Sequence, residues 1–272
     1  MTKRVSMETS EVLALAEQLI NEAEVEGLVL RTMGALAMLM RVRNSPICLQ
    51  LYTQIGRIEE GSLQLTDIDF VGYKKQRTKI ESFLRSRGFE PDYYVNAMFG
   101  EQRMIFHHPN RLFSIDIFLS PLKFSHMVDL GTQPGRGRIE LIKYTLAPAD
   151  LLLLKLQIHD INRKDLADAT ILLSCHEVSE GSEEGINMQR VIEVLCDDWG
   201  FYYDAMSNLG KVKLFVQELD AKLPQFHELL ERAINNVNLI EEAVEKAPKT
   251  KNWLRRSKIG TRKRWYETVE EI

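Results

Sequence analysis

The sequence predicts an α+β protein, with a small mixed β-sheet flanked by helices and followed by an all-helical C-terminal half. Up to residue 146, short apolar runs typical of strands are interspersed with helical patterns, and beyond Pro148 the apolar patterns repeat at the helical period. The 272 residues suffice for one large domain or two modest ones. We therefore expect an α+β domain over residues 1–146, a helical domain over 147–246 and a basic tail over 247–272.

The elements of the first half follow from apolar periodicity and from glycine and proline breaks. Residues 10–24 have apolar side chains at helical spacing, and Gly27 marks the end of that helix. Residues 44–61 fit either a strand or part of a longer excursion. The remaining expected elements are a strand over 28–34, a helix from Gly34, a strand over 63–71, a helix over 74–87, and strands over 103–108, 111–119 and 138–146.

Helical patterns fill the second half. The polar segment SEGSEEG, residues 179–185, interrupts them and predicts a loop. Pro248 begins the basic tail. The expected helices cover residues 149–160, 163–174 and 187–196, and two long stretches that end at Val244.

The charge is distributed unevenly along the chain. The net charge is −4, but residues 246–272 hold nine Lys or Arg and three Glu, so the tail is basic and the rest is acidic. The tail interleaves its cations with Trp253, Trp265 and Tyr266. Cations with stacking rings are typical of nucleic-acid contacts, so this tail is where an RNA acceptor would bind if the chain modifies RNA. A solvated terminus, or one docked on the acidic body, is the alternative.

Apolar runs and cysteines bear on the compartment. No apolar run approaches the roughly 20 residues that a membrane span needs, and the N-terminal residues lack the apolar core of a secretory signal. Cys48, Cys175 and Cys196 are widely spaced and odd in number, which indicates neither a disulfide framework nor a zinc site. We expect a cytoplasmic protein with no membrane partner.

Two aspartates stand in the segment expected to form the strand over 63–71. Alternate side chains of a strand share a face, so Asp67 and Asp69 would point the same way, with their Cα atoms about 7 Å apart. Aspartate is disfavoured in strands, and like charges on one face repel unless something positive lies between them. A divalent cation resolves this conflict, because hard cations prefer carboxylate oxygens. An exposed edge strand could also carry the pair.

A third aspartate repeats the pattern in the strand expected over 111–119, where Asp116 lies between Ile115 and Ile117. If the two strands are neighbours, Asp116 joins Asp67 and Asp69 on one face. Three carboxylates there predict a site for two metal ions that clamp a triphosphate, with one carboxylate accepting a proton from an attacking hydroxyl.

The order of these features resembles the DNA polymerase beta-type nucleotidyltransferase superfamily. It consists of a glycine at a strand-to-helix turn, a D-x-D strand, a single aspartate on a later strand, and then helices. The closer resemblance is to abortive-infection (AbiEii-type) nucleotidyltransferase toxins, whose helical second half carries a lysine followed by K/R-D-x-x-D. Here that part reads LAPADLLLLKLQIHDINRKDLADATILL, residues 146–173. The resemblance covers residues 28–173 and implies a nucleotidyltransferase core in the α+β domain.

The resemblance implies a role for each matching residue. Gly34 takes the place of the glycine whose backbone N–H groups approach the nucleotide phosphates, and Ala35 takes the place of the family's second Gly or Ser. Asp67 and Asp69 match the metal-binding pair. Asp116 matches the third carboxylate, which shares a metal ion and is the expected base.

The helical half supplies the remaining matches. Lys155 matches the phosphate-contacting lysine, although its apolar helix also fits a side chain that extends its ammonium to solvent. Asp165 and Asp168 match the two acids of the final motif and would assist nucleotide binding. Residues three apart share a helix face, so a solvated face or a charge at a helix N-terminus is the alternative interpretation of this pair.

The resemblance therefore implies a toxin-like, metal-dependent nucleotidyltransferase. It would use Mg²⁺ (or Mn²⁺) and an NTP, transfer an NMP to a hydroxyl or phosphate acceptor such as RNA, and pair with an antitoxin protein. The alternative is a catalytically degenerate module of the same fold that binds a nucleotide or a nucleic acid. Two departures from the family pattern favour it, namely Ala35 and the 33-residue spacing from Gly34 to Asp67.

Overall fold

The computed structural model describes residues 8–57 and 67–268, and the chain divides into two compact units. The first unit comprises Met1–Asn44, Ile58–Leu122 and Asp129–Leu146, and the second comprises Ser45–Arg57, Lys123–Val128 and Ala147–Ile272. Segments 45–57 and 123–128 thus group with the helical second unit, although both lie within residues 1–146 of the sequence.

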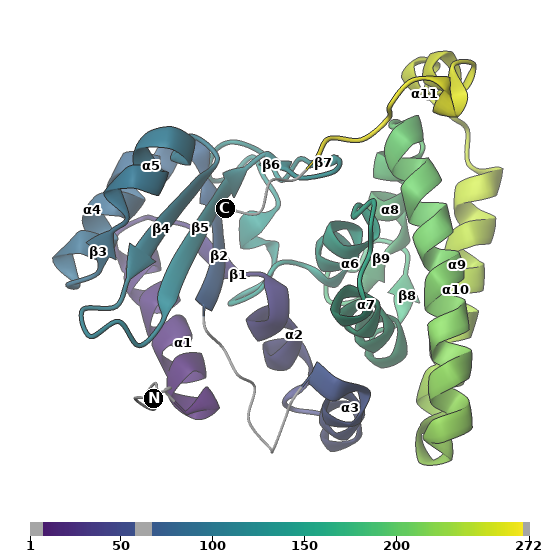
Figure 1. Ribbon diagram of the computed structural model, residues 1–272, viewed down its shortest axis with the longest axis horizontal. Coiled ribbons are helices and arrows are strands. Elements are labelled where there is room, and N and C mark those ends of the chain that lie inside the picture. The colour runs from purple at the N-terminus through teal and green to yellow at the C-terminus, as the bar shows by residue number, and fades with distance from the viewer. Residues whose placement is uncertain (1–7, 58–66, 269–272) are drawn as a thin grey trace. The chain divides into compact units, whose positions relative to one another are not determined.

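A mixed five-stranded sheet forms the centre of the first unit, in the order β1-β2-β5-β4-β3 (Figure 1). Strands β2 and β5 run parallel, and the other neighbours run antiparallel. The strands are β1 (Leu30–Thr32), β2 (Asp67–Tyr73), β3 (Glu90–Pro91), β4 (Arg103–His107) and β5 (Ser114–Ser120). The predicted α+β class and small mixed sheet are confirmed.

The hydrophobic core of the first unit lies on one face of this sheet, where helices α1 and α4 pack (Figure 1). Side chains alternate along β2, so Ile68 and Phe70 enter the core while Asp67 and Asp69 belong to the opposite face. The helices of this unit are α1 (Thr9–Val25), α2 (Gly34–Val42), α4 (Arg77–Ser86) and α5 (Tyr93–Phe99), with a 3₁₀ turn at Lys74–Gln76.

Two stretches of the first half differ from the expectation or extend it. The strand expected over 138–146 is wrong, because residues Ile139–Leu141 form a 3₁₀ helix and only Thr145 makes a bridge, to Thr32. Tyr144 has a φ of 72°, which an extended strand does not allow. Residues 44–61, for which two interpretations stood, form helix α3 (Pro46–Tyr52) and a π-helical turn (Thr53–Arg57) as far as the structure describes them. Residues 58–61, and residues 63–66 of the expected strand, lie outside the described ranges.

Helices dominate the second unit, as predicted, and α10 packs against both α7 and α9 (Figure 1). The unit is not all-helical, because two short parallel strands, β8 (Val178–Ser179) and β9 (Ile186–Asn187), flank the polar segment. Within the described ranges, none of the helices combines the length and apolarity needed to cross a membrane. The helices are α3, α6 (Pro148–Leu156), α7 (Arg163–Cys175), α8 (Met188–Leu195), α9 (Trp199–Lys222), α10 (His227–Lys246) and α11 (Lys251–Ser257), and further short elements are β6 (Leu122–Lys123), β7 (Met127–Val128) and 3₁₀ turns at Pro224–Phe226 and Gly260–Arg262.

A disulfide joins α3 to α7 in the second unit. It links Cys48 to Cys175, with their Cα atoms 6.1 Å apart, while Cys196 is a buried free thiol. The expectation that the cysteines form no disulfide is therefore wrong for this pair. The two cysteines lie 127 residues apart in the sequence, and only the packing of α3 on α7 brings them together.

Candidate metal centre

Three aspartates converge at the first unit's sheet. The parallel register of β2 and β5 places Asp69 opposite Asp116, and Asp67 precedes Asp69 by two residues on the same face. One carboxylate oxygen from each residue lies within 4.8 Å of those from the other two. The prediction that the two strands are neighbours and share an acidic face is confirmed.

The three carboxylates differ in burial. Asp67 is exposed, Asp69 is half-buried, and Asp116 is buried, with 3% of its surface exposed. Burial raises the pKa of Asp116 above its ordinary value, and the nearby charge of Asp67 adds to the increase, while an ion pair with Arg103 opposes it. Asp116 is therefore more basic than an ordinary aspartate. Sequence reasoning did not identify Arg103, because its approach depends on the pairing of β4 with β5.

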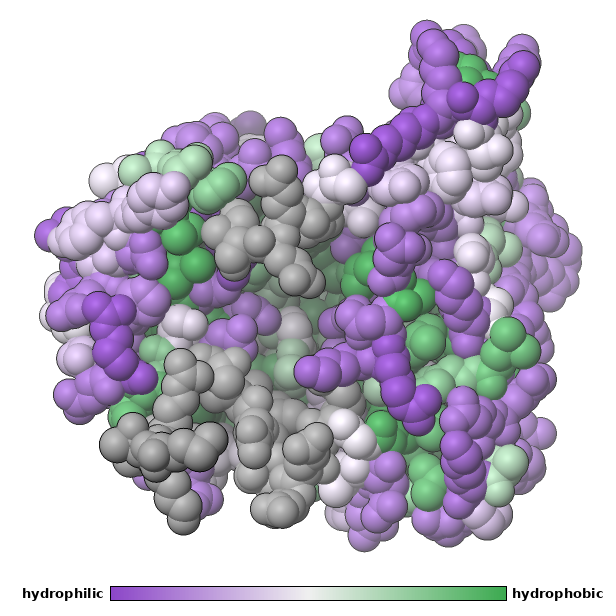
Figure 2. Space-filling view, in the orientation of Figure 1, coloured by the Kyte–Doolittle hydropathy of each residue, from purple (hydrophilic) through white to green (hydrophobic). Residues whose placement is uncertain are grey.

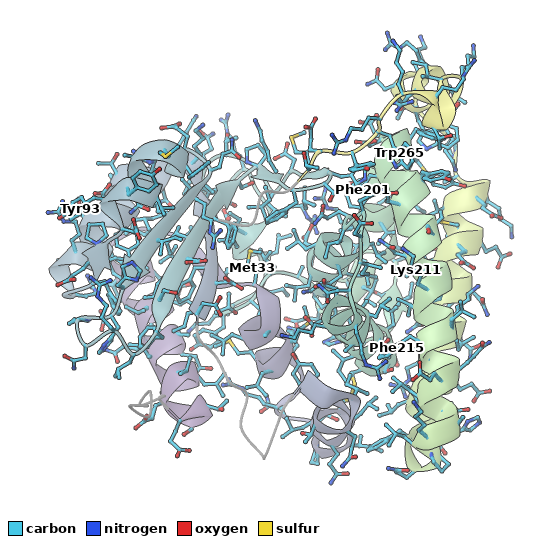
Figure 3. The ribbon with its side chains drawn as sticks, viewed as in Figure 1. Met33, Tyr93, Phe201, Lys211, Phe215 and Trp265 are labelled. Atoms are coloured by element: carbon cyan, nitrogen blue, oxygen red, sulfur yellow. A yellow bond between two sulfur atoms is a disulfide. The ribbon has the colours of Figure 1, made fainter. Side chains whose placement is uncertain are left out.

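Gly34 lies against this group at the start of α2. The residue before it, Met33 (Figure 3), donates its backbone N–H to the carbonyl oxygen of Asp69 at 3.0 Å. Gly34 has a φ of +64°, and a Cβ at this position would lie 2.4 Å from Asp69 Oδ2. Only glycine combines this backbone conformation with such a close approach. Ala35 follows in the first turn of α2 and is half-buried.

This donor set fits a hard divalent cation. Mg²⁺ and Mn²⁺ favour carboxylate oxygens, and three such oxygens gather here from two adjacent strands. The absence of a Cβ at Gly34 allows Asp69 Oδ2 to take its place in this group. Asp67, Asp69 and Asp116 are the residues that would hold the ion.

The other predicted residues form a separate cluster inside the second unit. Lys155 on α6 places its Nζ 2.9 Å from Asp165 Oδ1 and 2.9 Å from Asp168 Oδ2, both on α7. Tyr52 on α3 donates its hydroxyl to Asp168 Oδ1 at 3.2 Å. Asn162 caps α7 and accepts hydrogen bonds from the backbone N–H groups of its first turn, which fixes the start of the helix that carries both acids. The sequence order K…D-x-x-D therefore folds into one ion-paired group.

This geometry decides between the interpretations of the cluster. The Lys155 side chain is only 15% exposed and its ammonium faces the two acids, so it does not extend to solvent. Asp168 is fully buried, so a solvated helix face is wrong for this residue. Burial disfavours the charged form of Lys155, but the charges of Asp168 and Asp165 outweigh burial and raise its pKa. Contact between Lys155 and a phosphate stays a prediction.

The basic tail docks on the second unit through its aromatic residues. Trp265 donates its Nε1–H to Asp204 Oδ1 at 3.0 Å, and Tyr266 stacks on His159 with ring centroids 3.5 Å apart. Figure 3 shows Trp265 and Phe201 near the beginning of α9, where Asp204 also lies. For Trp265 and Tyr266, the interpretation of a tail docked on the body therefore holds. Nucleic-acid contact through the remaining exposed cations stays a prediction.

Asp204 is the centre of a network that sequence reasoning missed. His126 Nε2 lies 2.8 Å from Asp204 Oδ2, and His159 Nδ1 lies 3.0 Å from the same oxygen. Burial opposes the carboxylate, but the hydrogen bonds from His126, Trp265 and His159 outweigh it and lower the pKa of Asp204. These residues are 33 to 139 positions apart in the sequence, so no spacing pattern could have indicated the network.

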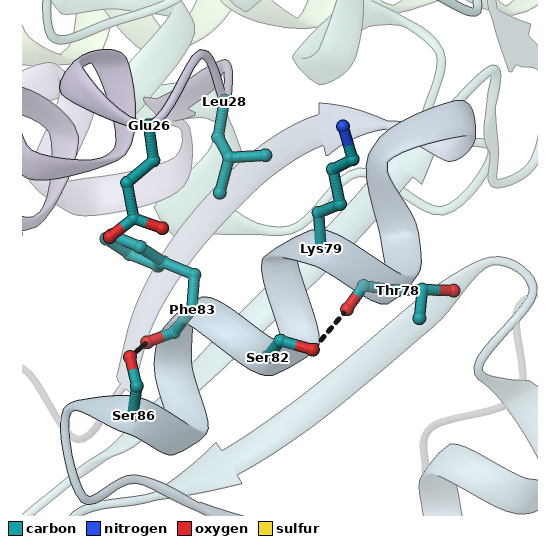
Figure 4. A pocket seen from close by; sticks show the side chains of 7 residues that line it. All are labelled: Glu26, Leu28, Thr78, Lys79, Ser82, Phe83 and Ser86. Carbon is teal, nitrogen blue, oxygen red and sulfur yellow. Dashed lines mark hydrogen bonds between the residues drawn. The ribbon is translucent and has the colours of Figure 1, made fainter.

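A hollow of about 520 Å³ lies elsewhere on the first unit, between α1 and α4 (Figure 4). Two of its hydroxyls are already used within α4, since Ser82 donates to the Thr78 carbonyl and Ser86 to the Phe83 carbonyl. The acidic residues of the candidate metal centre do not line it. We assign no ligand to this hollow.

Helix α5 presents apolar side chains at the surface of the first unit (Figure 2). None of its seven residues is buried, and Tyr93 and Tyr94 are 71% and 74% exposed. The side chain of Asn96 holds the helix to β4 by bonding both the N–H and the carbonyl of Ile105. A covering partner is not defined by these contacts.

Comparison of the chain with protein-family models, with curated proteins and with solved structures finds no match.

Proposed function

We propose that the chain is a metal-dependent nucleotidyltransferase that moves an NMP from an NTP to a hydroxyl or phosphate acceptor. One observation carries this proposal: three carboxylate oxygens from two neighbouring parallel strands lie within 4.8 Å of one another. The close approach of Gly34 to Asp69 supports it, because only a residue without a Cβ lets the start of α2 lie this close to a carboxylate of the acidic group.

The three aspartates of the first unit have different roles in this reaction. Asp67 and Asp69 hold Mg²⁺ (or Mn²⁺), which when bound neutralises charge on the triphosphate. Asp116 accepts the proton of the acceptor hydroxyl, and burial makes it a better base than an ordinary aspartate. The acceptor oxygen forms a bond to the α-phosphorus, the bond from the α-phosphorus to the bridging oxygen breaks, and pyrophosphate leaves. Roles for Lys155, Asp165 and Asp168 in holding the nucleotide stay predictions.

Label transfer tests this proposal. The intact chain is incubated with Mg²⁺ or Mn²⁺, each α-labelled NTP, and separate pools of total RNA and protein. We expect label in one pool, and Asp69→Asn and Asp116→Asn to reduce transfer by about a hundredfold or more. The exposed Asp197→Asn is the matched control and should transfer as the wild type does. Wild-type protein that labels neither pool, or an Asp69→Asn variant with full activity, would refute the proposal.

A second candidate is a nucleotide-binding module that no longer catalyses transfer. The ion pair of Arg103 with Asp116 favours it, because the guanidinium engages the carboxylate that is expected to act as the base. Ala35 favours it too, because alanine lacks the hydroxyl of a serine. Isothermal titration separates the two candidates. NTP binding that needs Asp69 but gives no label transfer identifies the module, and transfer identifies the enzyme.

Partners of the proposed enzyme follow from the same resemblance. A toxin-like role predicts growth arrest on expression and rescue by an antitoxin protein, which co-expression with neighbouring genes tests. An RNA acceptor held by the tail predicts salt-sensitive binding through its exposed cations. Replacement of Lys258, Arg262 and Lys263 by Gln should weaken RNA binding without loss of NTP binding, whereas unchanged RNA binding contradicts a role for the tail.

A further inference from the structure

Arg103 forms an ion pair with Asp116, the buried acid of the candidate metal centre. It is the first residue of β4, and it lies opposite Phe118, two residues beyond Asp116 on β5. Its Nη2 donates to Asp116 Oδ2. Its Cζ lies 5.2 Å from the centroid of the Phe118 ring, which supports the guanidinium from a second side.

The guanidinium is incompletely satisfied in this position. Arg103 Nε is buried, yet it has no hydrogen-bond partner among the described residues. A buried donor left without a partner costs free energy, so the paired arrangement is weaker than the ion pair alone would suggest. The Arg103 side chain is 24% exposed, whereas that of Asp116 is 5% exposed. The arginine can therefore move toward solvent while the aspartate stays in place.

A divalent cation and Arg103 draw on the same carboxylate. Asp116 offers one of the three oxygens that define the candidate site, and the guanidinium already neutralises that carboxylate. The positive charge of Arg103 repels a cation that binds here. The cation therefore either displaces the guanidinium or binds against its repulsion. Any cost of breaking the ion pair reduces the observed metal affinity.

We infer that Arg103 is a displaceable counter-ion, which pairs with Asp116 in the metal-free protein and is released when a divalent cation binds. The inference rests on the metal site of the proposed function but not on catalysis. It has an unusual consequence. Removal of this positively charged partner should therefore strengthen metal binding, whereas most substitutions at a binding site weaken it.

The test measures Mn²⁺ affinity in the absence of nucleotide, from the electron paramagnetic resonance signal of free Mn²⁺ at pH 8. We expect Arg103→Gln to bind Mn²⁺ about tenfold more tightly than the wild type, since a competing positive charge is gone. Arg103→Lys keeps the charge but not the planar group that rests on Phe118, so its affinity should lie between the two. Arg85→Gln, an exposed arginine on α4, is the matched control and should leave the affinity unchanged.

A second measurement guards against a folding defect. Circular dichroism establishes that each variant is folded, and the Mn²⁺-induced rise in Tm should be larger for Arg103→Gln than for the wild type at equal Mn²⁺. If Arg103→Gln does not fold, Arg103→Lys alone decides, and an affinity equal to or weaker than that of the wild type overturns the inference.

The outcomes separate this inference from the proposed function. Tighter Mn²⁺ binding by Arg103→Gln supports the counter-ion whether or not the chain transfers label. Binding that appears only in Arg103→Gln supports it and points to the degenerate module. Unchanged or weaker binding in Arg103→Gln, or none in either protein, overturns it. Normal label transfer with unchanged Mn²⁺ affinity leaves the enzyme standing and removes the inference alone.

Discussion

The two units differ in what surrounds their clustered acids. In the second unit, nitrogen donors lie beside the carboxylates. Lys155 pairs with both Asp165 and Asp168, and Asp204 has the side-chain nitrogens of two histidines and a tryptophan around it. In the first unit, the carboxylate oxygens of three aspartates gather near one another, and the donor beside Asp116 is Arg103, whose side chain is partly exposed. The pKa shifts follow this difference, since the pKa of Asp204 is lowered by its donors while that of Asp116 is raised by burial and by the charge of Asp67.

The difference distinguishes structural acids from candidate ligands. A carboxylate held by fixed donors has its charge balanced by the fold and gains little from an added cation. A carboxylate crowded by other carboxylates gains from one. The comparison therefore makes the acidic group of the first unit the candidate for a metal ion, and it predicts that the lysine cluster of the second unit contributes chiefly to stability. Three experiments test this contrast, and a fourth tests the cross-link of the second unit.

The largest effect is expected from Lys155→Met. It removes the cation from two acids, one of which is fully buried, and breaking a buried ion pair costs about 3–5 kcal/mol. Urea denaturation measures the free energy of unfolding. Lys222→Met is the matched control, because Lys222 pairs with Glu218 on an exposed surface and should change stability by less than about 1 kcal/mol. A cost below 1 kcal/mol for Lys155→Met would show that the cluster is not structural.

The next effect concerns the cross-link of the second unit. Reduction of the Cys48–Cys175 disulfide should lower the free energy of unfolding by about 2–4 kcal/mol, because the bond closes a long loop in the unfolded chain. Urea denaturation with and without dithiothreitol measures it. In Cys48→Ser, the reductant should change nothing. Thiol titration of the denatured, unreduced protein should find one free thiol, that of Cys196, and three free thiols would contradict the pairing.

Much of the acidic centre could be predicted from the sequence, because strand alternation fixes which residues share a face. Asp67 and Asp69 needed only a period of two, and Asp116 needed the further expectation that its strand is a neighbour. Gly34 lies beside Asp69, but its predicted contact with nucleotide phosphates stays a prediction.

Long-range pairing set the limit of prediction. Arg103 reaches Asp116 only through the antiparallel register of β4 and β5, and Cys48 reaches Cys175 only through the packing of α3 on α7. The strand expected over 138–146 failed for a different reason. Its apolar and β-branched residues suit a strand, but the backbone of Tyr144 turns into the left-handed region, which composition does not reveal.

A smaller effect separates backbone strain from site geometry in the first unit. Gly34→Ala and Gly27→Ala both place alanine at a positive φ, of 64° and 70°, and each should cost about 1–2 kcal/mol of stability. Only Gly34 has Asp69 Oδ2 at 2.4 Å from the added Cβ, whereas nothing lies within 4 Å at Gly27. Mn²⁺ affinity should therefore fall in Gly34→Ala and not in Gly27→Ala. Equal affinities in the two variants would separate Gly34 from the metal centre.

The smallest expected effect is a dependence of stability on pH, and it tests the contrast in the second unit. The pKa of Asp204 is lowered in the folded protein, so its ionised form contributes stability above the unfolded-state pKa of about 3.9, and this contribution is lost as the pH falls through the folded-state pKa. Asp204→Asn has no such group. Its deficit in the free energy of unfolding relative to the wild type should therefore be largest at pH 5–7 and shrink toward pH 2.

Asp197→Asn, at an exposed aspartate near the start of the same helix, is the control, and its free energy of unfolding should change with pH as that of the wild type does. A deficit for Asp204→Asn that is constant with pH would mean that its three neighbours do not favour the carboxylate, and the distinction between donor-held and crowded acids would then lose its support in this unit.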